Sequence, residues 1–437
     1  KGVNYYSGIH DILKRRRTVI GADGNPEPVD NIPNNRIINN QYKKMVDQKV
    51  NYLCGKKVTY NSENKAYADS VTELLDGDFN RVLKRLCEDS LNCGIGWLYI
   101  NYDEKGELSF RRFRPWEILP GWADAEHTKL SYAIRAYEVI LYEGKTRKIE
   151  TKVEVFDNSG IKRFILDGGK LIPDDINWQT PYFYKGDTGL NWNRIPLIPF
   201  KYNADEIPLI KNVKTLQDGL NLVLSNFQNG MEEDPRNTIL VLKNYDGENL
   251  GEFRRNLATY GAVKVRSADG SDGGVDTLKI EVSSENYKTI IEIFKKAIIE
   301  NAMGYDAKDD RLGGSANQMN IQSMYSDIDL DANGMETEYR ASFGELLEFV
   351  KAHFANTGKG NFDGESLDVI FNRDILINEG EAIENCAKSK GILSDETIVA
   401  QHPWVDDVTA ELKRIKKENK ALEAEYREPQ IASDEDE

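Results

Sequence analysis

The sequence has few of the residue types that build disulfides, metal clusters and membrane spans. Its four cysteines form no CxxC pair, which predicts reduced thiols in a cytosolic chain. Its four histidines lie far apart and adjoin no pattern typical of a metal site or a catalytic triad. No apolar run approaches the roughly 20 residues that cross a bilayer. We therefore expect no metal, no cofactor and no membrane association.

Basic residues are outnumbered by acidic ones, 57 to 73. The 437 residues carry a net charge of −16, with a pI near 5.0. Domains that hold nucleic acid by neutralising phosphates are normally basic, so any DNA contact is expected to be weak. The 40% hydrophobic content and the length predict two to four domains with real cores. Lys1 begins no signal-peptide pattern, and the missing initiator Met indicates that the native start lies upstream.

Two short patterns resemble known sites but fail at a required position. Gly144-Lys145-Thr146 matches the end of a phosphate-binding loop, yet the earlier glycine would fall at a valine in a strand-like run. Residues 329–334 fit the first half of a calcium loop, but Arg340 stands where a bidentate acid is required. No carboxylate pair stands out either. The sequence therefore predicts no catalytic residues.

Apolar periodicity divides the chain into helical and sheet regions. Period-two alternation predicts an antiparallel sheet over residues 97–200, and the Gly- and Pro-rich residues 21–33 are expected to form a loop. Residues 405–426 repeat apolar positions at three-four spacing, which predicts a helix that packs against a partner. The remaining helices are predicted at 5–17, 39–53, 64–93 with a break near Gly77, 317–355 with a kink near Gly334 or Gly344, and 379–390, with a short strand at 367–371.

The central part of the chain is organised as a stalk that carries a small module. A helix at 208–234 leads to a β-rich insert at 235–282, a second helix returns at 283–303, and a polar loop follows at 304–318. The insert has about 48 residues with little apolar content, so it is marginal by itself. We expect its strand edges to pair with other copies of the chain.

Several stretches in the same order along the chain resemble portal proteins of long-tailed double-stranded DNA bacteriophages, the siphophage-type portal family. The resemblance covers nearly the whole sequence. It is carried by Tyr5–Ile12 (YYSGIHDI), Asn39–Lys56 (NNQYKKMVDQKVNYLCGK), Ile239–Tyr245 (ILVLKNY), Gly273–Asp276 (GGVD), Gly313–Asn317 (GGSAN), Met324–Leu330 (MYSDIDL) and Gly391–Thr397 (GILSDET).

The resemblance implies an α+β portal-type fold that assembles into a ring, usually of about twelve subunits. Such a subunit has a helical and β wing, a two-helix stem, a small α/β clip, a tunnel loop, a long kinked wing helix and a helical crown. Carried onto this chain, these parts are the wing at 1–207 and 319–378, stem helices at 208–234 and 283–303, the clip at 235–282, the tunnel loop at 304–318, the crown at 379–428 and an acidic tail at 429–437.

The family resemblance also implies a function. The ring would form the channel at one capsid vertex through which double-stranded DNA is packaged and later ejected, and it would assemble in the host cytoplasm. Its expected partners are the terminase large subunit, the connector proteins of the tail, and the major capsid and scaffolding proteins. Candidate DNA-facing residues of the tunnel loop are Lys308, Arg311, Asn317 and Gln318, and candidate partner contacts of the clip are Asn244, Tyr245, Glu248, Arg254 and Arg255.

Two other classes of protein remain open from the residues alone. One is a non-viral structural or scaffold protein that assembles through the apolar repeat at residues 405–426. The other is an enzyme that acts on nucleic acid through carboxylate-bound Mg²⁺, for which the sequence shows no acidic cluster. Electron microscopy would separate these classes, because only the portal reading predicts rings with a central channel.

Overall fold

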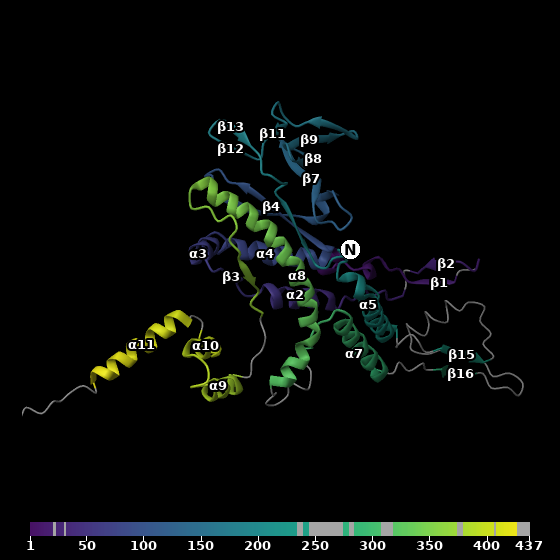
Figure 1. The fold of residues 1–437 in the computed structure, drawn as a ribbon. Coiled ribbons are helices and arrows are strands. Elements are labelled where there is room, and N and C mark those ends of the chain that lie inside the picture. The colour runs from purple at the N-terminus through teal and green to yellow at the C-terminus, as the bar shows by residue number, and fades with distance from the viewer. Residues whose placement is uncertain are drawn as a thin grey trace, which may run out of the picture. The chain divides into compact units, whose positions relative to one another are not determined.

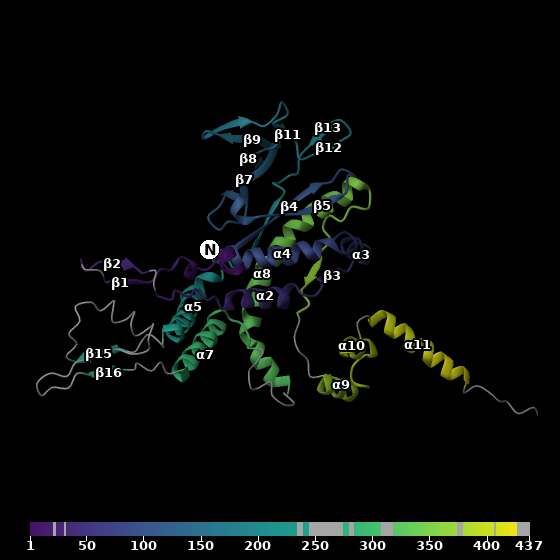
Figure 2. The same ribbon diagram turned by 180° about the vertical axis from the view of Figure 1, so that it is seen from behind.

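The computed structural model describes residues 1–20, 23–29, 32–233, 239–243, 274–278, 284–306, 318–373, 379–405 and 408–425. The chain divides into two compact units, and each unit is discontinuous in sequence. The first contains residues 1–47 and 86–302, and the second contains residues 48–85 and 303–437. Figures 1 and 2 show the ribbon from two opposite sides.

The first unit contains most of the strands and two long helices. Its elements are α1 (Gly2–Tyr6), η1 (Asp11–Lys14), β1 (Thr18–Ile20), β2 (Pro26–Pro28), β4 (Ile95–Tyr102), β5 (Leu108–Phe113), η2 (Pro115–Glu117), β6 (Ile118–Trp122), β7 (Leu130–Glu143), β8 (Thr146–Asp157), β9 (Gly160–Asp167), β10 (Lys170–Pro173), β11 (Gln179–Thr180), β12 (Phe183–Lys185), β13 (Thr188–Leu190), β14 (Leu197–Lys201), α5 (Ile210–Glu233), β15 (Ile239–Lys243), β16 (Gly274–Leu278) and α7 (Ser284–Asn301).

The second unit is mainly helical. Two helices, α2 (Gln41–Cys54) and α4 (Asp78–Cys93), have residues in both units. The other elements are β3 (Thr59–Asn61), α3 (Lys65–Leu74), α8 (Gln318–Thr357), β17 (Asp368–Ile370), α9 (Glu379–Lys388), α10 (Asp395–Ala400) and α11 (Val408–Glu425).

The antiparallel sheet region predicted at residues 97–200 is confirmed. One sheet has the order β10-β9-β8-β7-β6, with β11 added to β9, and a second has the order β14-β4-β5. The second sheet lies in the core, since all five residues of β14 are buried. Gly144 and Lys145 form the turn between β7 and β8, with Gly144 at φ 63°. The turn requires a glycine at this position, so Gly144 needs no phosphate-binding role to explain it.

Two predictions for the N-terminal 33 residues are wrong. The helix expected at residues 5–17 ends at Tyr6, and only a short 3-10 turn follows at Asp11–Lys14. Gly8 adopts φ 82°, a left-handed conformation that interrupts a right-handed helix. The expected loop at 21–33 contains β2, which pairs with β1. In the sequence Pro26 and Pro28 indicate a loop, but proline is also tolerated in edge strands.

The helix predicted at residues 208–234 is α5, and the returning helix is α7, which ends two residues earlier than expected. The two helices approach closely at Gly219, where an added Cβ would lie 2.7 Å from the ring of Phe294. Phe227 and Tyr287 pack at 4.9 Å between ring centroids about two helical turns further along. The missing side chain at Gly219 therefore allows this close packing of α5 on α7.

Buried polar side chains follow one face of α5 and bind a segment of the N-terminal region. We call these side chains the polar ladder: Gln217, Asn221, Ser225 and Asn229. Four residues apart on a helix is about 6 Å, and two residues apart on an extended chain is about 6.6 Å. The two repeats therefore match for residues 35, 37 and 39, and the fourth contact comes from Tyr42 at the start of α2. Four backbone N–H groups donate to this polar ladder: Asn35 to Asn229 Oδ1 (2.7 Å), Ile37 to Ser225 Oγ (2.9 Å), Asn39 to Asn221 Oδ1 (3.0 Å) and Tyr42 to Gln217 Oε1 (3.0 Å).

His10 extends the polar ladder and has a defined tautomer. Because Asn221 Oδ1 accepts from the backbone of Asn39, its Nδ2 faces His10 Nδ1 at 2.8 Å and donates to it. His10 Nε2 therefore carries the proton and donates to the carbonyl of Tyr5 at 3.0 Å. Burial lowers the pKa of His10 below its ordinary value. The imidazole is thus held neutral, which is a structural role.

The core of the second unit forms around α8, which is unbroken through Gly334 and Gly344. Both views show α8 bending along its length (Figures 1 and 2). Its apolar stripe includes Tyr339, Phe343 and Phe354, all fully buried. The short strand predicted at 367–371 is β17, which pairs with β3. The break predicted near Gly77 is confirmed, since Gly77 separates α3 from α4 at φ 64°.

Candidate functional site at the base of the 307–317 segment

Most residues predicted to contact DNA or partner proteins lie outside the described part of the chain. These are Lys308, Arg311 and Asn317 of the expected loop, and Asn244, Tyr245, Glu248, Arg254 and Arg255 of the expected clip. Gln318 is the first residue of α8. The structure does describe what holds residues 303–305, just before the 307–317 segment, and what holds the part of α8 that follows it, and these contacts are the candidate site.

Gln48 of α2 holds the chain just before the segment through a two-point contact. Its Nε2 donates to the carbonyl of Tyr305 at 2.8 Å, and the N–H of Tyr305 donates back to its Oε1 at 3.0 Å. The side-chain amide thus replaces a neighbouring strand for this one residue. The ring of Tyr305 also packs against Tyr325 of α8 at 4.5 Å. Residue 305 is therefore fixed from two sides.

Lys49 places a buried ammonium beside the backbone at residue 303. Its side chain is 3% exposed, and its Nζ lies 3.0 Å from the carbonyl oxygen of Met303 and 2.7 Å from Asp331 Oδ2 of α8. A buried charge needs a counter-charge, which Asp331 supplies. Met303 itself adopts φ 50°, so the Lys49 contact supports a backbone turn that non-glycine residues rarely form.

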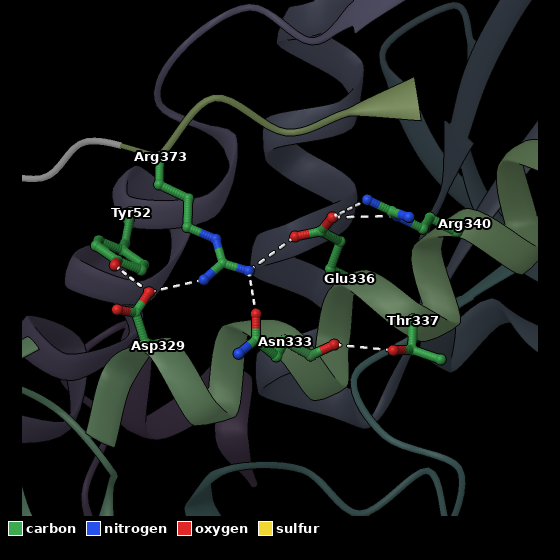
Figure 3. Close-up of polar contacts among 7 residues, drawn as sticks. All are labelled: Tyr52, Asp329, Asn333, Glu336, Thr337, Arg340 and Arg373. Carbon is green, nitrogen blue, oxygen red and sulfur yellow. Dashed lines mark hydrogen bonds and ion pairs between the residues drawn. The ribbon is translucent and has the colours of Figure 1, made fainter. Parts of the chain in front are cut away.

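A second network joins α8 to the chain that follows β17 (Figure 3). Arg373 donates to Asp329 Oδ1 at 2.7 Å and to Glu336 Oε2 at 2.8 Å, and it also bonds Asn333 Oδ1. The hydroxyl of Tyr52 donates to the same Oδ1 of Asp329. Burial, and then this bond, raise the pKa of Tyr52 above its ordinary value. For Arg373, burial lowers the pKa, but the two carboxylates outweigh it and raise the pKa overall.

The acidic residues that resemble half a calcium loop are therefore already paired with side-chain cations. Asp331 pairs with Lys49, and Asp329 pairs with Arg373. They also lie on a continuous helix and not on a loop. No group of three or more His, Cys, Asp or Glu residues that could hold a metal ion occurs in the described ranges. The arrangement anchors backbone, and it places no nucleophile beside a general base.

Sequence reasoning missed Gln48, Lys49, Tyr52 and Arg373. One signal was visible, because Lys49 stands within the apolar stripe of the predicted helix at 39–53. A lysine on a buried face requires an acid or a carbonyl group nearby. Asp331 lies 282 residues away in sequence, so the sequence could not show that it is the partner of Lys49.

Among the described residues, no helix is both long and apolar enough to cross a membrane.

Comparison with known proteins gives a family match over almost the whole chain. Residues 1–424 match the family described as phage portal protein, SPP1 Gp6-like. The chain is 32% identical to the portal protein of Bacillus phage SPP1 over 424 residues, which cover 96% of this chain and 83% of the relative. It is 29% identical to the portal protein of Clostridium phage phiCD119 over 433 residues, which cover 96% of this chain and 92% of the relative.

Two solved structures are similar at a lower level. The neck of an empty GTA particle has a TM-score of 0.41 and 15% identity, covering 82% of this chain and 87% of the other. The virion of a native gene transfer agent particle has a TM-score of 0.38 and 14% identity with the same coverage.

Proposed function

The chain belongs to the SPP1 Gp6-like family of phage portal proteins, and from this premise we propose that its copies form a ring-shaped DNA channel at one capsid vertex. The match to the family over residues 1–424 is the observation that carries this proposal. It confirms the resemblance to phage portal proteins found in the sequence and leaves the coiled-coil scaffold without support. Genomic double-stranded DNA would enter through the ring during packaging and leave through it during ejection.

The acidic composition suits a conduit. Twelve copies would carry roughly −190 formal charges, from −16 for each chain. DNA affinity comes largely from cations that neutralise phosphates, so an acidic ring binds DNA weakly. Weak binding allows DNA to slide. The ring itself supplies no catalysis in this proposal, and the terminase motor supplies the energy of packaging.

The 307–317 segment is proposed to be the part of the chain that meets DNA. Lys308, Arg311, Asn317 and Gln318 would contact the phosphate backbone, and the neighbouring acids would keep each contact weak. Gln48 and Lys49 support this role, because they fix the backbone at residues 303–305 immediately before the segment. A loop whose base is fixed can present the same groups to DNA at each step.

The other parts of the chain take their proposed roles from the family. Helices α5 and α7 would form the stem, and the insert at 235–282 would be the clip. Asn244, Tyr245, Glu248, Arg254 and Arg255 would bind the terminase large subunit and later the connector proteins. The wing, which includes α8, would face the major capsid and scaffolding proteins, and residues 379–428 would form the crown. Assembly would take place in the host cytoplasm.

Two experiments test the proposal. Electron microscopy of the purified chain should show rings with a central channel, whereas rods or monomers would refute the assembly. For the loop, replacing Lys308 and Arg311 with Ala should reduce DNA packaging while ring assembly persists. The matched control replaces Lys145 and Arg147, one lysine and one arginine at the β7–β8 turn. Normal packaging by the loop variant would exclude the proposed DNA contact.

A further inference from the structure

A cavity of about 200 Å³ lies between the two larger sheets of the first unit. Tyr99 and Phe113 come from β4 and β5, and Phe156 comes from β8 of the facing sheet. Their rings pack against one another, with Tyr99 and Phe113 stacked at 4.8 Å and Tyr99 and Phe156 edge-on at 5.5 Å. The cavity therefore has aromatic walls held in fixed positions, and its volume suits a single side chain or a small organic molecule.

Three arginines and one carboxylate, that of Glu154, line the same cavity, so positive charge is in excess. Arg135 is neutralised, because it donates to Glu117 at 2.9 Å and to Glu154 at 3.2 Å. Arg111 and Arg163 form no ion pair with any described residue. Arg163 makes one side-chain hydrogen bond, from Nη1 to the hydroxyl of Thr180 at 2.8 Å. Two guanidinium groups thus line the cavity with donors to spare.

A neutral acceptor completes the polar lining. Asn101 Nδ2 donates to the carbonyl of Tyr102 at 2.9 Å. Its Oδ1 is buried and has no hydrogen-bond partner among the described residues, although Asn101 lines the cavity. Buried polar atoms are normally satisfied. A ligand that fits must therefore bring both an anionic acceptor for the arginines and a donor for Asn101.

We propose that this cavity binds an acidic residue of a peptide, and that it does so through the side-chain carboxylate. The carboxylate lies between Arg111 and Arg163, where charge-assisted hydrogen bonds are strongest. The methylene groups contact Phe113 and Phe156, and a backbone N–H of the same peptide donates to Asn101 Oδ1. Phosphate lacks the apolar portion that the aromatic walls match. The peptide belongs either to another protein or to the acidic end of this chain, residues 433–437.

Ligand-observed NMR on the full-length protein tests this site with N-acetyl-glutamate N-methylamide as the probe. The matched neutral probe is N-acetyl-glutamine N-methylamide, which has nearly the same shape and no charge. We expect the glutamate probe to bind at least tenfold more tightly, since the two arginines recognise its charge. Equal saturation transfer for the two probes, or none for the glutamate probe in both the full-length chain and a chain that ends at Ala432, would overturn the proposal.

Two substitutions locate the binding and a third serves as the control. R111A and R163A should each weaken binding of the glutamate probe roughly tenfold, while R147A removes the same charge from an exposed position outside the cavity and should leave binding unchanged. If R163A alters the fold through loss of the Thr180 contact, R111A alone decides. Unchanged affinity in R111A refutes the assignment.

A chain that ends at Ala432 distinguishes the two sources of the peptide. If the acidic end of the chain occupies the cavity, its removal increases the affinity for the free probe. If another protein supplies the acidic residue, the shortened and full-length chains bind the probe equally. Increased affinity assigns the acidic end of the chain, and equal affinity excludes it, whereas the probe and arginine experiments decide whether the site exists.

Discussion

Replacing Asn221 with Ala should destabilise the first unit far more than the same substitution nearby on the same helix. Asn221 is fully buried, and its side chain satisfies the N–H of Asn39 and the Nδ1 of His10. The N221A substitution leaves both groups buried without a partner, at about 1–3 kcal/mol each. The expected loss is therefore roughly 2–6 kcal/mol of the free energy of unfolding.

The control is N226A, which changes the same residue type five positions away on α5. Asn226 is exposed and accepts one hydrogen bond, from Arg15 at 3.0 Å. Both substitutions gain the same helix propensity, so their difference isolates the buried contacts. Urea unfolding at one protein concentration measures that difference, and hydrogen exchange at Asn39 should accelerate only in N221A. A difference below about 0.5 kcal/mol would show that the polar ladder adds no stability.

Two further predictions concern buried titratable groups. K49M removes the cation that neutralises Asp331 and binds the carbonyl of Met303. Urea unfolding should show that the free energy of unfolding falls by about 3 kcal/mol. The double variant K49M/D331N should recover part of this loss, and no recovery would contradict a charge effect. Because burial lowers the pKa of His10, the unfolded chain binds the proton first, so stability should fall as the pH drops below about 6.5. H10Q should flatten this slope in urea titrations at pH 7.0 and 5.5, and an unchanged slope would assign the pH dependence to other groups.

The long helices could be predicted closely because their signal is local. The apolar stripe of α5 gave residues 208–234 against the observed Ile210–Glu233, and Gly77 marked the break between α3 and α4. The helix predicted in the N-terminal region was wrong because its end depends on contacts that are not local. Apolar spacing around Ile12 is compatible with a helix, but the positive φ at Gly8 depends on how the chain turns to reach α5.

The polar ladder on α5 shows why contacts between distant segments could not be predicted. Its residues recur every fourth position and are visible in the sequence, but a polar stripe on a helix usually faces water. The partner segment lies about 180 residues earlier and has no regular secondary structure at residues 35–40. The same limit applies to the contacts before the 307–317 segment. Lys49 could be noticed on an apolar stripe, but Asp331 could not be identified as its partner.

The polar ladder also has a mechanical consequence. Three of its hydrogen bonds join α5 to an extended segment at residues 35–39, and the fourth joins α5 to Tyr42 at the start of α2, so the bonded residues run antiparallel to α5. A force along the helix axis loads all four bonds together in shear, so they must break in concert. A force perpendicular to the axis, applied at Asn35, opens them one after another. The joint is therefore strong along α5 and weak across it, so its strength depends on the direction of pulling.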